Sequence, residues 1–243
     1  MPDIFAKQNG TILEITLNRP DQGNGATDEM AMELTRFIKE APADTHCIVL
    51  RGAGADFCIG RATMGQRPTS PVEALQRKRA FDVVFDCYGA IRHAPVPVIA
   101  VVQGRALGFG CAIAAIADIT IASDKATFQV PEMAHNILPT MVMSSFVDRV
   151  PRKAFTYLVY STAVIDGERA LSFGIVSDVV PAAQLEGEVQ KVTAAILKAP
   201  APAVRAVKEY ARTAFSMHTE GAIDFARNIH AVINSSSEMR PSA

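Results

Sequence analysis

The stretch Pro97–Ala122, PVIAVVQGRALGFGCAIAAIADITIA, decides the fold because its pattern changes three times. Val98–Val102 and Ile119–Ala122 are short, wholly apolar runs, which are typical of strands in a sheet covered on both faces. Between them, the glycine-marked loop Gly104–Gly110 leads into a helix of small residues at Cys111–Ala117. The stretch therefore predicts strand, loop, helix and strand in close succession, which is an α/β arrangement.

The same alternation extends toward the N-terminus. Ile12–Leu17 alternates apolar and polar residues and predicts a strand. Thr27 is a suitable N-cap for an amphipathic helix that continues to about Ala41, and Cys47–Leu50 is another apolar strand. Further predicted elements are a helix with the apolar stripe Phe81, Val84, Phe85, Tyr88 and Ile91, a helix between Asp166 and Gly174, and a strand over Ile175–Val180.

After Pro181 the periodicity is helical throughout. The three apolar stripes are Leu185, Val189, Val192 and Ile196; Val204, Val207, Ala211 and Phe215; and Ala222, Phe225, Ile229 and Ile233. We therefore predict an α/β core over residues 1–181 and a helical region over residues 182–243.

Composition excludes several classes of function. The 243 residues include 24 Lys+Arg and 25 Asp+Glu, so the net charge of −1 gives no support for a nucleic-acid or acidic-membrane partner. The longest apolar run, Ala112–Ala117, is too short to span a bilayer. The cysteines form no C-x-x-C pair and the histidines share no ligand spacing, so no metal site is expected. Without a secretory pattern at Met1–Gly10, we predict a reducing, cytoplasmic location.

Two glycine-containing loops follow predicted strands, at Phe57–Arg61 and at Ala106–Cys111. Glycine lets the main chain approach a ligand closely, and the second loop opens a helix whose first N–H groups lack internal partners. Two such N–H groups aimed at one point would stabilise an oxyanion. From the glycines alone, ordinary turns between strand and helix are the favoured interpretation.

The ordered set of motifs resembles the crotonase family, also called the enoyl-CoA hydratase/isomerase family. Phe57–Arg61 resembles its oxyanion loop, F-x-x-G-x-D, and Pro97–Ala122 resembles its signature P-V-I-A-x-V-x-G-x-A-x-G-G-G. Phe128–Glu132 resembles its F-x-x-P-E motif. Leu17–Pro20 and residues 166–181 also fit in order, so the resemblance covers nearly the whole chain.

This resemblance implies a fold and a class of substrate. The fold is a right-handed spiral of β-β-α units, with C-terminal helices that build trimers, often paired into hexamers. The substrate is an acyl-CoA thioester, and coenzyme A enters as part of it, so no separate cofactor is expected.

The resemblance also implies the site residues. The backbone N–H groups of Arg61 and Phe109 would polarise the thioester carbonyl and stabilise an enolate, and Glu132 would be the acid/base. Residues that align with positions lining the substrate and coenzyme A are Gln22, Gly23, Ile59, Gly60 and Gly108.

Departures from the family pattern help to distinguish between the activities found in the family. Hydratases of the family carry two glutamates, but the first is replaced here by Ala112, and only Glu132 remains. Isomerases of the family likewise keep only the second, and one carboxylate suffices to move a proton between two carbons. The loop aspartate is Ala62, the middle glycine of the triplet is Phe109, and Thr140–Ser145 replaces a glycine-rich stretch. An isomerase-like enzyme is therefore the leading hypothesis. The alternatives are a hydratase or other acyl-CoA activity, and a non-catalytic member that binds acyl-CoA or protein.

Three charged residues outside the loops have more than one interpretation. Taken alone, Glu132 after Val-Pro would be an exposed turn residue; the motif makes it catalytic. Lys208 is expected on a solvated helix face, with contact to a CoA phosphate across a subunit boundary as the alternative. Asp118 is expected to be structural.

Overall fold

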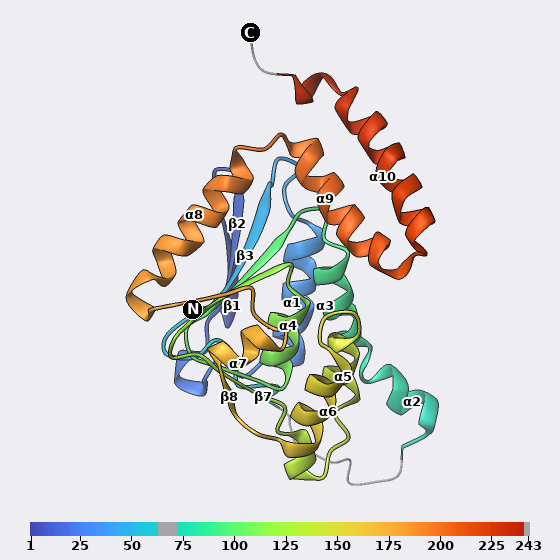
Figure 1. Ribbon diagram of the computed structural model, residues 1–243. Coiled ribbons are helices and arrows are strands. Elements are labelled where there is room, and N and C mark those ends of the chain that lie inside the picture. The colour runs from blue at the N-terminus through green and yellow to red at the C-terminus, as the bar shows by residue number, and fades with distance from the viewer. Residues whose placement is uncertain (63–71, 241–243) are drawn as a thin grey trace.

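The computed structural model describes residues 1–62 and 72–240 and centres on a twisted sheet of six strands (Figure 1). In spatial order the strands are β1 (Ile4–Asn9), β2 (Ile12–Leu17), β3 (Cys47–Gly52), β4 (Val98–Val102), β6 (Ile119–Ser123) and β9 (Asp178–Val180). All neighbours pair in parallel from β2 onward, and β1 pairs antiparallel with β2.

Helices cover both faces of this sheet. On one face, Ile48 and Leu50 of β3 belong to the main core beneath α1 (Asp28–Lys39), α3 (Asp82–Arg92) and α4 (Phe109–Ile116). On the other face, Cys47 and Val49 pack with residues of α8 (Leu185–Leu197). Alternate residues of one apolar strand thus serve two cores, which confirms the prediction made from the strand pattern.

A second, smaller sheet lies at the end of the first. It contains β5 (Arg105–Leu107), β7 (Thr127–Gln129) and β8 (Ile165–Asp166). Each of β4 and β6 continues into a short strand of the small sheet and then into a helical segment, α4 or the 3₁₀ helix η2 (Glu132–His135). This repeated succession is the predicted β-β-α unit.

Several elements differ from their predicted bounds. Strand β5 lies inside the predicted loop Gly104–Gly110, and α4 begins at Phe109, earlier than expected. The predicted strand Ile175–Val180 shortens to β9, because the N–H groups of Ile175 and Val176 donate to the Ala170 carbonyl. Elements that the sequence did not predict include β1, α2 (Ala74–Arg79) and α5 (Thr140–Phe146).

The remaining short elements connect these layers. They are η1 (Pro20–Gln22), α6 (Arg152–Ser161), α7 (Gly167–Ser172), η3 (Ala182–Gln184), η4 (Ala214–Ser216) and η5 (Ser237–Met239). Asp166 caps α7 as predicted, since its carboxylate accepts from the N–H of Arg169 at 2.9 Å. Thr27 likewise caps α1 by accepting from the N–H of Met30 at 3.2 Å.

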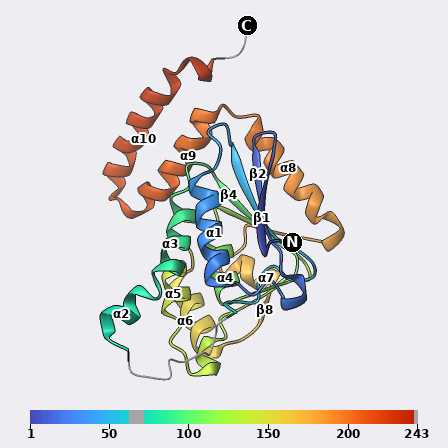
Figure 2. The ribbon, with the colours of Figure 1, turned by 180° about the vertical axis from the view of Figure 1, so that it is seen from behind.

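The C-terminal part is helical, as predicted. After α8 come α9 (Ala201–Thr213) and α10 (Thr219–Asn234), and α10 extends away from the sheets beside α9 in both views (Figures 1 and 2). The rings of Tyr210 and Phe225 stack at 5.7 Å between these two helices. No residue of α10 is buried in the single chain. A domain boundary at residue 181 stays a prediction.

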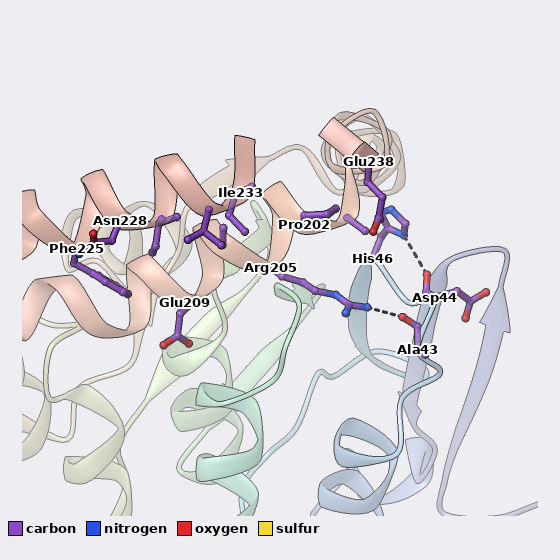
Figure 3. Close-up of a pocket in the computed structure, with 14 residues that line it drawn as sticks. Ala43, Asp44, His46, Pro202, Arg205, Glu209, Phe225, Asn228, Ile233 and Glu238 are labelled. Atoms are coloured by element: carbon purple, nitrogen blue, oxygen red, sulfur yellow. Dashed lines mark hydrogen bonds between the residues drawn. The ribbon is translucent and has the colours of Figure 1, made fainter. Parts of the chain in front are cut away.

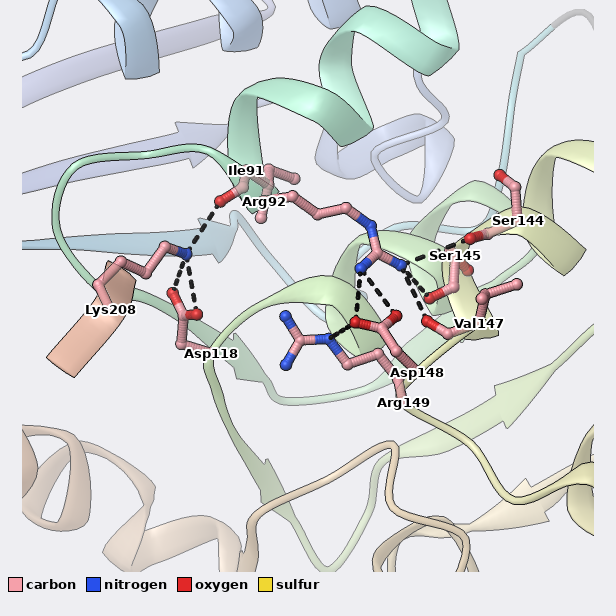
Figure 4. Close-up of polar contacts among 9 residues, drawn as sticks. All are labelled: Ile91, Arg92, Asp118, Ser144, Ser145, Val147, Asp148, Arg149 and Lys208. Carbon is pink, nitrogen blue, oxygen red and sulfur yellow. Dashed lines mark hydrogen bonds and ion pairs between the residues drawn. The ribbon is translucent and has the colours of Figure 1, made fainter. Parts of the chain in front are cut away.

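Lys208 attaches α9 to the core (Figure 4). Its side chain is only 4% exposed, and Nζ lies 2.8 and 2.6 Å from the two carboxylate oxygens of Asp118 and 3.2 Å from the Ile91 carbonyl oxygen. Asp118 also accepts from the N–H of Val98 at 2.7 Å, at the start of β4. Burial lowers the pKa of Lys208, and the charge of Asp118 opposes that shift. The expectation of a solvated Lys208 is therefore wrong, and its ammonium is occupied by Asp118 rather than free for a phosphate.

An arginine holds the end of α5 against α3. Arg92 donates to the Asp148 carboxylate at 2.9 Å and to the Ser145 carbonyl at 2.9 Å (Figure 4). Because the last carbonyls of a helix lack internal partners, a guanidinium there satisfies them. The atypical Thr140–Ser145 stretch is thus an ordered helix with a fixed C-terminal end.

Within the described residues, no helix is long and apolar enough to cross a membrane. The four cysteines are buried and unpaired, and burial raises the pKa of the Cys47 thiol to about 11. The cytoplasmic location stays a prediction.

Candidate active site

The two glycine-containing loops lie side by side. Cys58 forms a parallel bridge with Ala106, and the N–H of Leu107 donates to the Cys58 carbonyl at 2.9 Å. A Cβ atom added to Gly60 would lie 3.4 Å from the Leu107 carbonyl oxygen. Segments some fifty positions apart in the sequence therefore form one continuous edge.

Within the described residues, neither predicted oxyanion donor makes a hydrogen bond. The residues on either side of Arg61 form a bridge with Ala26: the N–H of Ala26 donates to the Gly60 carbonyl, and the N–H of Ala62 donates to the Ala26 carbonyl, both at 2.8 Å. The N–H of Arg61 itself has no acceptor among residues 1–62 and 72–240. Phe109 is the first residue of α4, so its N–H has no acceptor within the helix, nor elsewhere in the described chain. Both amides are available to a ligand, and their pairing as an oxyanion hole stays a prediction.

Gly108 and Gly110 have no room for a side chain, whereas the position between them does. Gly108 has φ +50°, and a Cβ atom there would lie 2.8 Å from Oε1 of Glu132. A Cβ on Gly110 would lie 2.0 Å from the Cys58 carbonyl oxygen. The ring of Phe109 instead packs on Tyr88, with centroids 5.7 Å apart. This packing explains how the triplet tolerates a phenylalanine without losing its backbone path.

Glu132 is buried beside the second loop. It opens η2 directly after β7, and β7 is tied to that loop because the N–H of Gly108 donates to the Gln129 carbonyl at 2.9 Å. The residue is 8% exposed, and its Oε2 has no hydrogen-bond partner among residues 1–62 and 72–240. Burial raises the pKa of Glu132, while a backbone N–H and the charge of His135 oppose the shift. The interpretation of Glu132 as an exposed turn residue is wrong; its catalytic role stays a prediction.

The position of the missing glutamate carries only a methyl group. Ala112 is fully buried in the first turn of α4, and its N–H donates to the Gly108 carbonyl at 2.9 Å. Of the two glutamate positions in the family pattern, only the one at Glu132 therefore carries a carboxylate.

The predicted coenzyme A loop adjoins the first oxyanion loop. The N–H of Ile59 donates to the Gly23 carbonyl at 3.0 Å, and a Cβ on Gly23 would lie 2.8 Å from Cγ2 of Ile59. Gln22 precedes this contact and receives a hydrogen bond from the Arg19 guanidinium. The structure thus brings Gly23, Ile59 and Gly60 together, on the same edge as Gly108 and Glu132. The contact of these residues with coenzyme A stays a prediction.

Asn24 holds that loop and was not predicted from the sequence. Its side-chain amide donates to the carbonyls of Ala53 at 2.8 Å and Asp56 at 2.7 Å, and its oxygen accepts from the N–H of Arg19 at 2.8 Å. The residue is fully buried with φ +56°. Asparagine tolerates this left-handed conformation, which is the sequence signal that points to a fixed turn.

Tyr88 was also missed. It was read as one member of an apolar helical stripe, and its ring does belong to the core. Burial raises the pKa of its phenol well above the usual range. The signal was a polar-tipped aromatic residue in an otherwise apolar stripe.

A large groove lies elsewhere (Figure 3). It holds about 910 Å³ between α9, α10 and the turn before β3. The groove is lined by Arg205 and Glu209 on α9, by Phe225 and Ile233 on α10, and by His46. None of these is a predicted site residue. The guanidinium of Arg205 reaches across to the Ala43 carbonyl at 2.5 Å. This groove separates the last helix from the core and carries no part of the candidate site.

Comparison with known proteins identifies the family. The enoyl-CoA hydratase/isomerase family model matches residues 7–243. A probable enoyl-CoA hydratase from Mycobacterium leprae is 33% identical over 221 residues, which are 89% of this chain and 84% of that protein. Human enoyl-CoA delta isomerase 2 is 31% identical over 206 residues, 83% of this chain and 52% of the human protein. The chain belongs to the enoyl-CoA hydratase/isomerase family.

The fold agrees with this assignment. The structure of an enoyl-CoA hydratase from Mycobacterium smegmatis matches with a TM-score of 0.91 at 24% identity, over 98% of this chain and 93% of that one. The crotonase-type α/β core with its helical C-terminal region is thereby confirmed. Since relatives named as hydratase and as isomerase match at similar identity, the choice between the two activities rests on the site.

Proposed function

We propose that this family member is an isomerase-like acyl-CoA enzyme that uses one carboxylate. The thioester oxygen binds between the N–H groups of Arg61 and Phe109, and Glu132 transfers the proton. Coenzyme A enters as part of the substrate, along Gln22, Gly23 and Ile59, and no further cofactor takes part.

The proposed reaction moves a double bond along the acyl chain. Glu132 removes a proton from C2 of a 3-enoyl-CoA, and the electron pair left behind is delocalised onto the thioester oxygen as an enolate. Protonation of C4 by the same carboxyl group then gives the 2-enoyl-CoA. The two backbone N–H groups stabilise the charge that develops on the oxygen. Since the proton is returned, no net acid or base is consumed.

The observation that supports this proposal is the buried environment of the Glu132 carboxylate. Its carboxylate is buried, has one oxygen without a partner among the described residues, and lies where a Cβ atom on Gly108, the residue before the Phe109 donor, would meet it at 2.8 Å. A carboxyl group with a raised pKa takes up and releases a proton near neutral pH more readily than an exposed one. With Ala112 in place of the first glutamate, Glu132 is the one carboxylate that the family's pair of glutamate positions retains.

The test separates hydration from isomerisation. Wild-type protein is incubated with 2-enoyl-CoA and with 3-enoyl-CoA, and the products are resolved. We expect double-bond migration, and a loss of about two to four orders of magnitude in Glu132→Gln, the usual contribution of general acid–base catalysis. Glu168→Gln, at an exposed position on α7, is the matched control and should keep full activity. Full activity in Glu132→Gln would mean that the base lies elsewhere.

Two alternatives give other outcomes. A hydratase or another acyl-CoA activity would convert 2-enoyl-CoA to its hydrated product, with Glu132 and a second group acting on water. A non-catalytic member would bind acyl-CoA, or a protein, without turnover of either substrate.

We also propose that the chain assembles through its C-terminal helices as a trimer or a dimer of trimers. The supporting observation is that α10 has no buried residue, while Ile223 and Val232 are exposed apolar side chains on it. A helix with this composition is normally covered by a partner. Light scattering at micromolar concentration checks this, and a monomer would contradict it.

A further inference from the structure

The first oxyanion loop is joined to the start of α1 through the side chain of Arg61. The guanidinium of Arg61 pairs with the carboxylate of Asp28, which is the first residue of that helix. The Arg61 side chain is 17% exposed and that of Asp28 is 46% exposed, so the pair lies at the edge of the core. Among residues 1–62 and 72–240, Asp28 is the one carboxylate within ion-pair distance of Arg61.

Two backbone hydrogen bonds hold the same loop against Ala26. The N–H of Ala26 donates to the Gly60 carbonyl, and the N–H of Ala62 donates to the Ala26 carbonyl, both at 2.8 Å. In such a parallel bridge, the residue between the two bonded groups turns its own N–H to the opposite side. The Arg61 N–H therefore faces away from Ala26, and its direction depends on the orientation of the peptide that joins Gly60 to Arg61.

The backbone alone holds this peptide weakly. The bridge between Ala26 and Arg61 is an isolated one, outside the named strands. Gly60 precedes it with φ +109°, and glycine moves between such conformations at little cost because it has no Cβ atom. A second contact is therefore needed to fix the orientation of the Arg61 N–H, and the ion pair with Asp28 provides one.

Asp28 is well placed to hold the loop in this way. Its helix is capped by Thr27, which accepts from the N–H of Met30 at 3.2 Å, and the positive N-terminal end of a helix favours a carboxylate. Leu34 and Ile38 fix α1 in the main core, since each is 1% exposed. The Arg61 guanidinium is thus paired with a rigid element of the fold.

This contact also replaces a carboxylate that the loop itself lacks. The loop motif places an aspartate two residues after its glycine, and that position here is Ala62. The carboxylate that contacts the loop at Arg61 comes from α1 instead. We propose that Asp28 is a positioning residue, which acts through the Arg61 guanidinium to hold the Arg61 N–H in the direction of the thioester oxygen.

This inference rests on the proposed function, in which the amides of Arg61 and Phe109 form the oxyanion hole, and kinetics on 3-enoyl-CoA test it first. Asp28→Asn should lower kcat about tenfold, less than the loss of about 100- to 1,000-fold that follows deletion of an oxyanion donor. KM should change little, because the contact acts on charge that develops in the transition state. Asp28→Glu keeps a carboxylate and should recover most of the activity. The matched control is Glu29→Gln, at the exposed next position of the same helical turn, and it should keep the wild-type kcat.

A charged ligand reports on the Arg61 amide without turnover. Acetoacetyl-CoA readily loses a proton from C2, and its enolate is distinguished from the neutral ligand by ultraviolet absorbance. Wild type should bind the enolate more tightly than it binds butyryl-CoA, and Asp28→Asn should weaken only the binding of the enolate, by about tenfold. Arg61→Met keeps the amide and removes the guanidinium, so in a double-mutant cycle either substitution alone should have the effect of both.

A purely structural role for Asp28 predicts different results. If Asp28 only stabilises the N-terminus of α1, then Asp28→Asn and Glu29→Gln lower Tm alike, while kcat and enolate binding stay at their wild-type values. That result overturns the inference, and so does an equal loss of affinity for the enolate and for butyryl-CoA. A wild-type protein that does not favour the enolate over butyryl-CoA contradicts the oxyanion hole itself, and the inference then fails together with the proposed function.

Discussion

Gly108 and Glu132 are packed so closely that a Cβ atom on residue 108 would lie 2.8 Å from the carboxylate oxygen. Gly108→Ala should therefore displace Glu132, and φ +50° adds backbone strain of about 1–3 kcal/mol. We expect activity on 3-enoyl-CoA to fall about 100-fold, as for other displacements of about 1 Å at a reacting group. Steady-state kinetics and urea denaturation measure the two effects.

Gly187→Ala is the matched control. Gly187 lies within α8, and an added Cβ atom would meet nothing within 4 Å. Alanine is the better helix former by about 1 kcal/mol, so this variant should be slightly more stable and fully active. Equal activity of the Gly108→Ala variant and wild type would contradict the placement of the carboxylate in the site.

Glu132→Gln should stabilise the protein in a pH-dependent way. Because burial raises the pKa of Glu132 above its usual value of 4.5, the ionised form is disfavoured in the folded state. The stability provided by neutral Glu132 is complete below the unfolded pKa and is lost as pH rises through the folded pKa. The variant does not lose this stability as the pH rises. Its Tm should therefore exceed that of wild type at about pH 8, and the difference between the two Tm values should shrink toward about pH 5. Calorimetry across this range measures it.

Lys208→Ala should destabilise the fold without acting on the chemistry. The ammonium is buried between Asp118 and the Ile91 carbonyl, and its removal leaves a carboxylate without its counter-charge. Breaking such a pair costs about 3–5 kcal/mol in the free energy of unfolding, measured here by denaturation in guanidinium chloride. Lys208→Met with Asp118→Asn should recover part of the loss, because the asparagine oxygen still accepts from the N–H of Val98.

Lys198→Ala, at an exposed position just after α8, is the control for Lys208→Ala. Surface substitutions of this kind change the free energy of unfolding by within about 0.5 kcal/mol. An equally small effect at Lys208 would show that the buried ion pair is dispensable for stability.

Apolar runs made the sheet and its two covered faces predictable. Cys47–Leu50 and Val98–Val102 have no polar residue to expose, so helices on both faces follow from burial alone. The N-caps Thr27 and Asp166 were predictable because capping depends on local spacing. Strand β1 was missed because Phe5, Lys7 and Asn9 give a weak pattern, and its pairing with β2 depends on tertiary contact.

The site was predictable only through its motifs. Local sequence places Glu132 in an exposed turn, and its burial depends on Gly108 and the pairing of β5 with β7. The Lys208–Asp118 pair joins residues 90 positions apart, and no local pattern encodes such a contact. The side chain of Tyr88 is an apolar ring that ends in a polar hydroxyl, and the hydrophobic periodicity of the helix depends on the ring alone.

Ala112→Glu should raise hydration relative to isomerisation. Ala112 follows Gly108 by one helical turn, so a glutamate there extends from the same face of α4 that contacts Glu132. Two carboxyl groups can divide the tasks of activating water and protonating the chain, and their mutual repulsion raises one of the two pKa values further. Overpacking of this fully buried position should cost about 1–3 kcal/mol, and Ala112→Gln measures that cost without the added acid. The readout is the ratio of hydrated to isomerised product from 2-enoyl-CoA, with its pH profile. The ratio should rise in Ala112→Glu and stay at the wild-type value in Ala112→Gln. A folded Ala112→Glu variant with an unchanged ratio would contradict the idea that the missing carboxylate sets the activity.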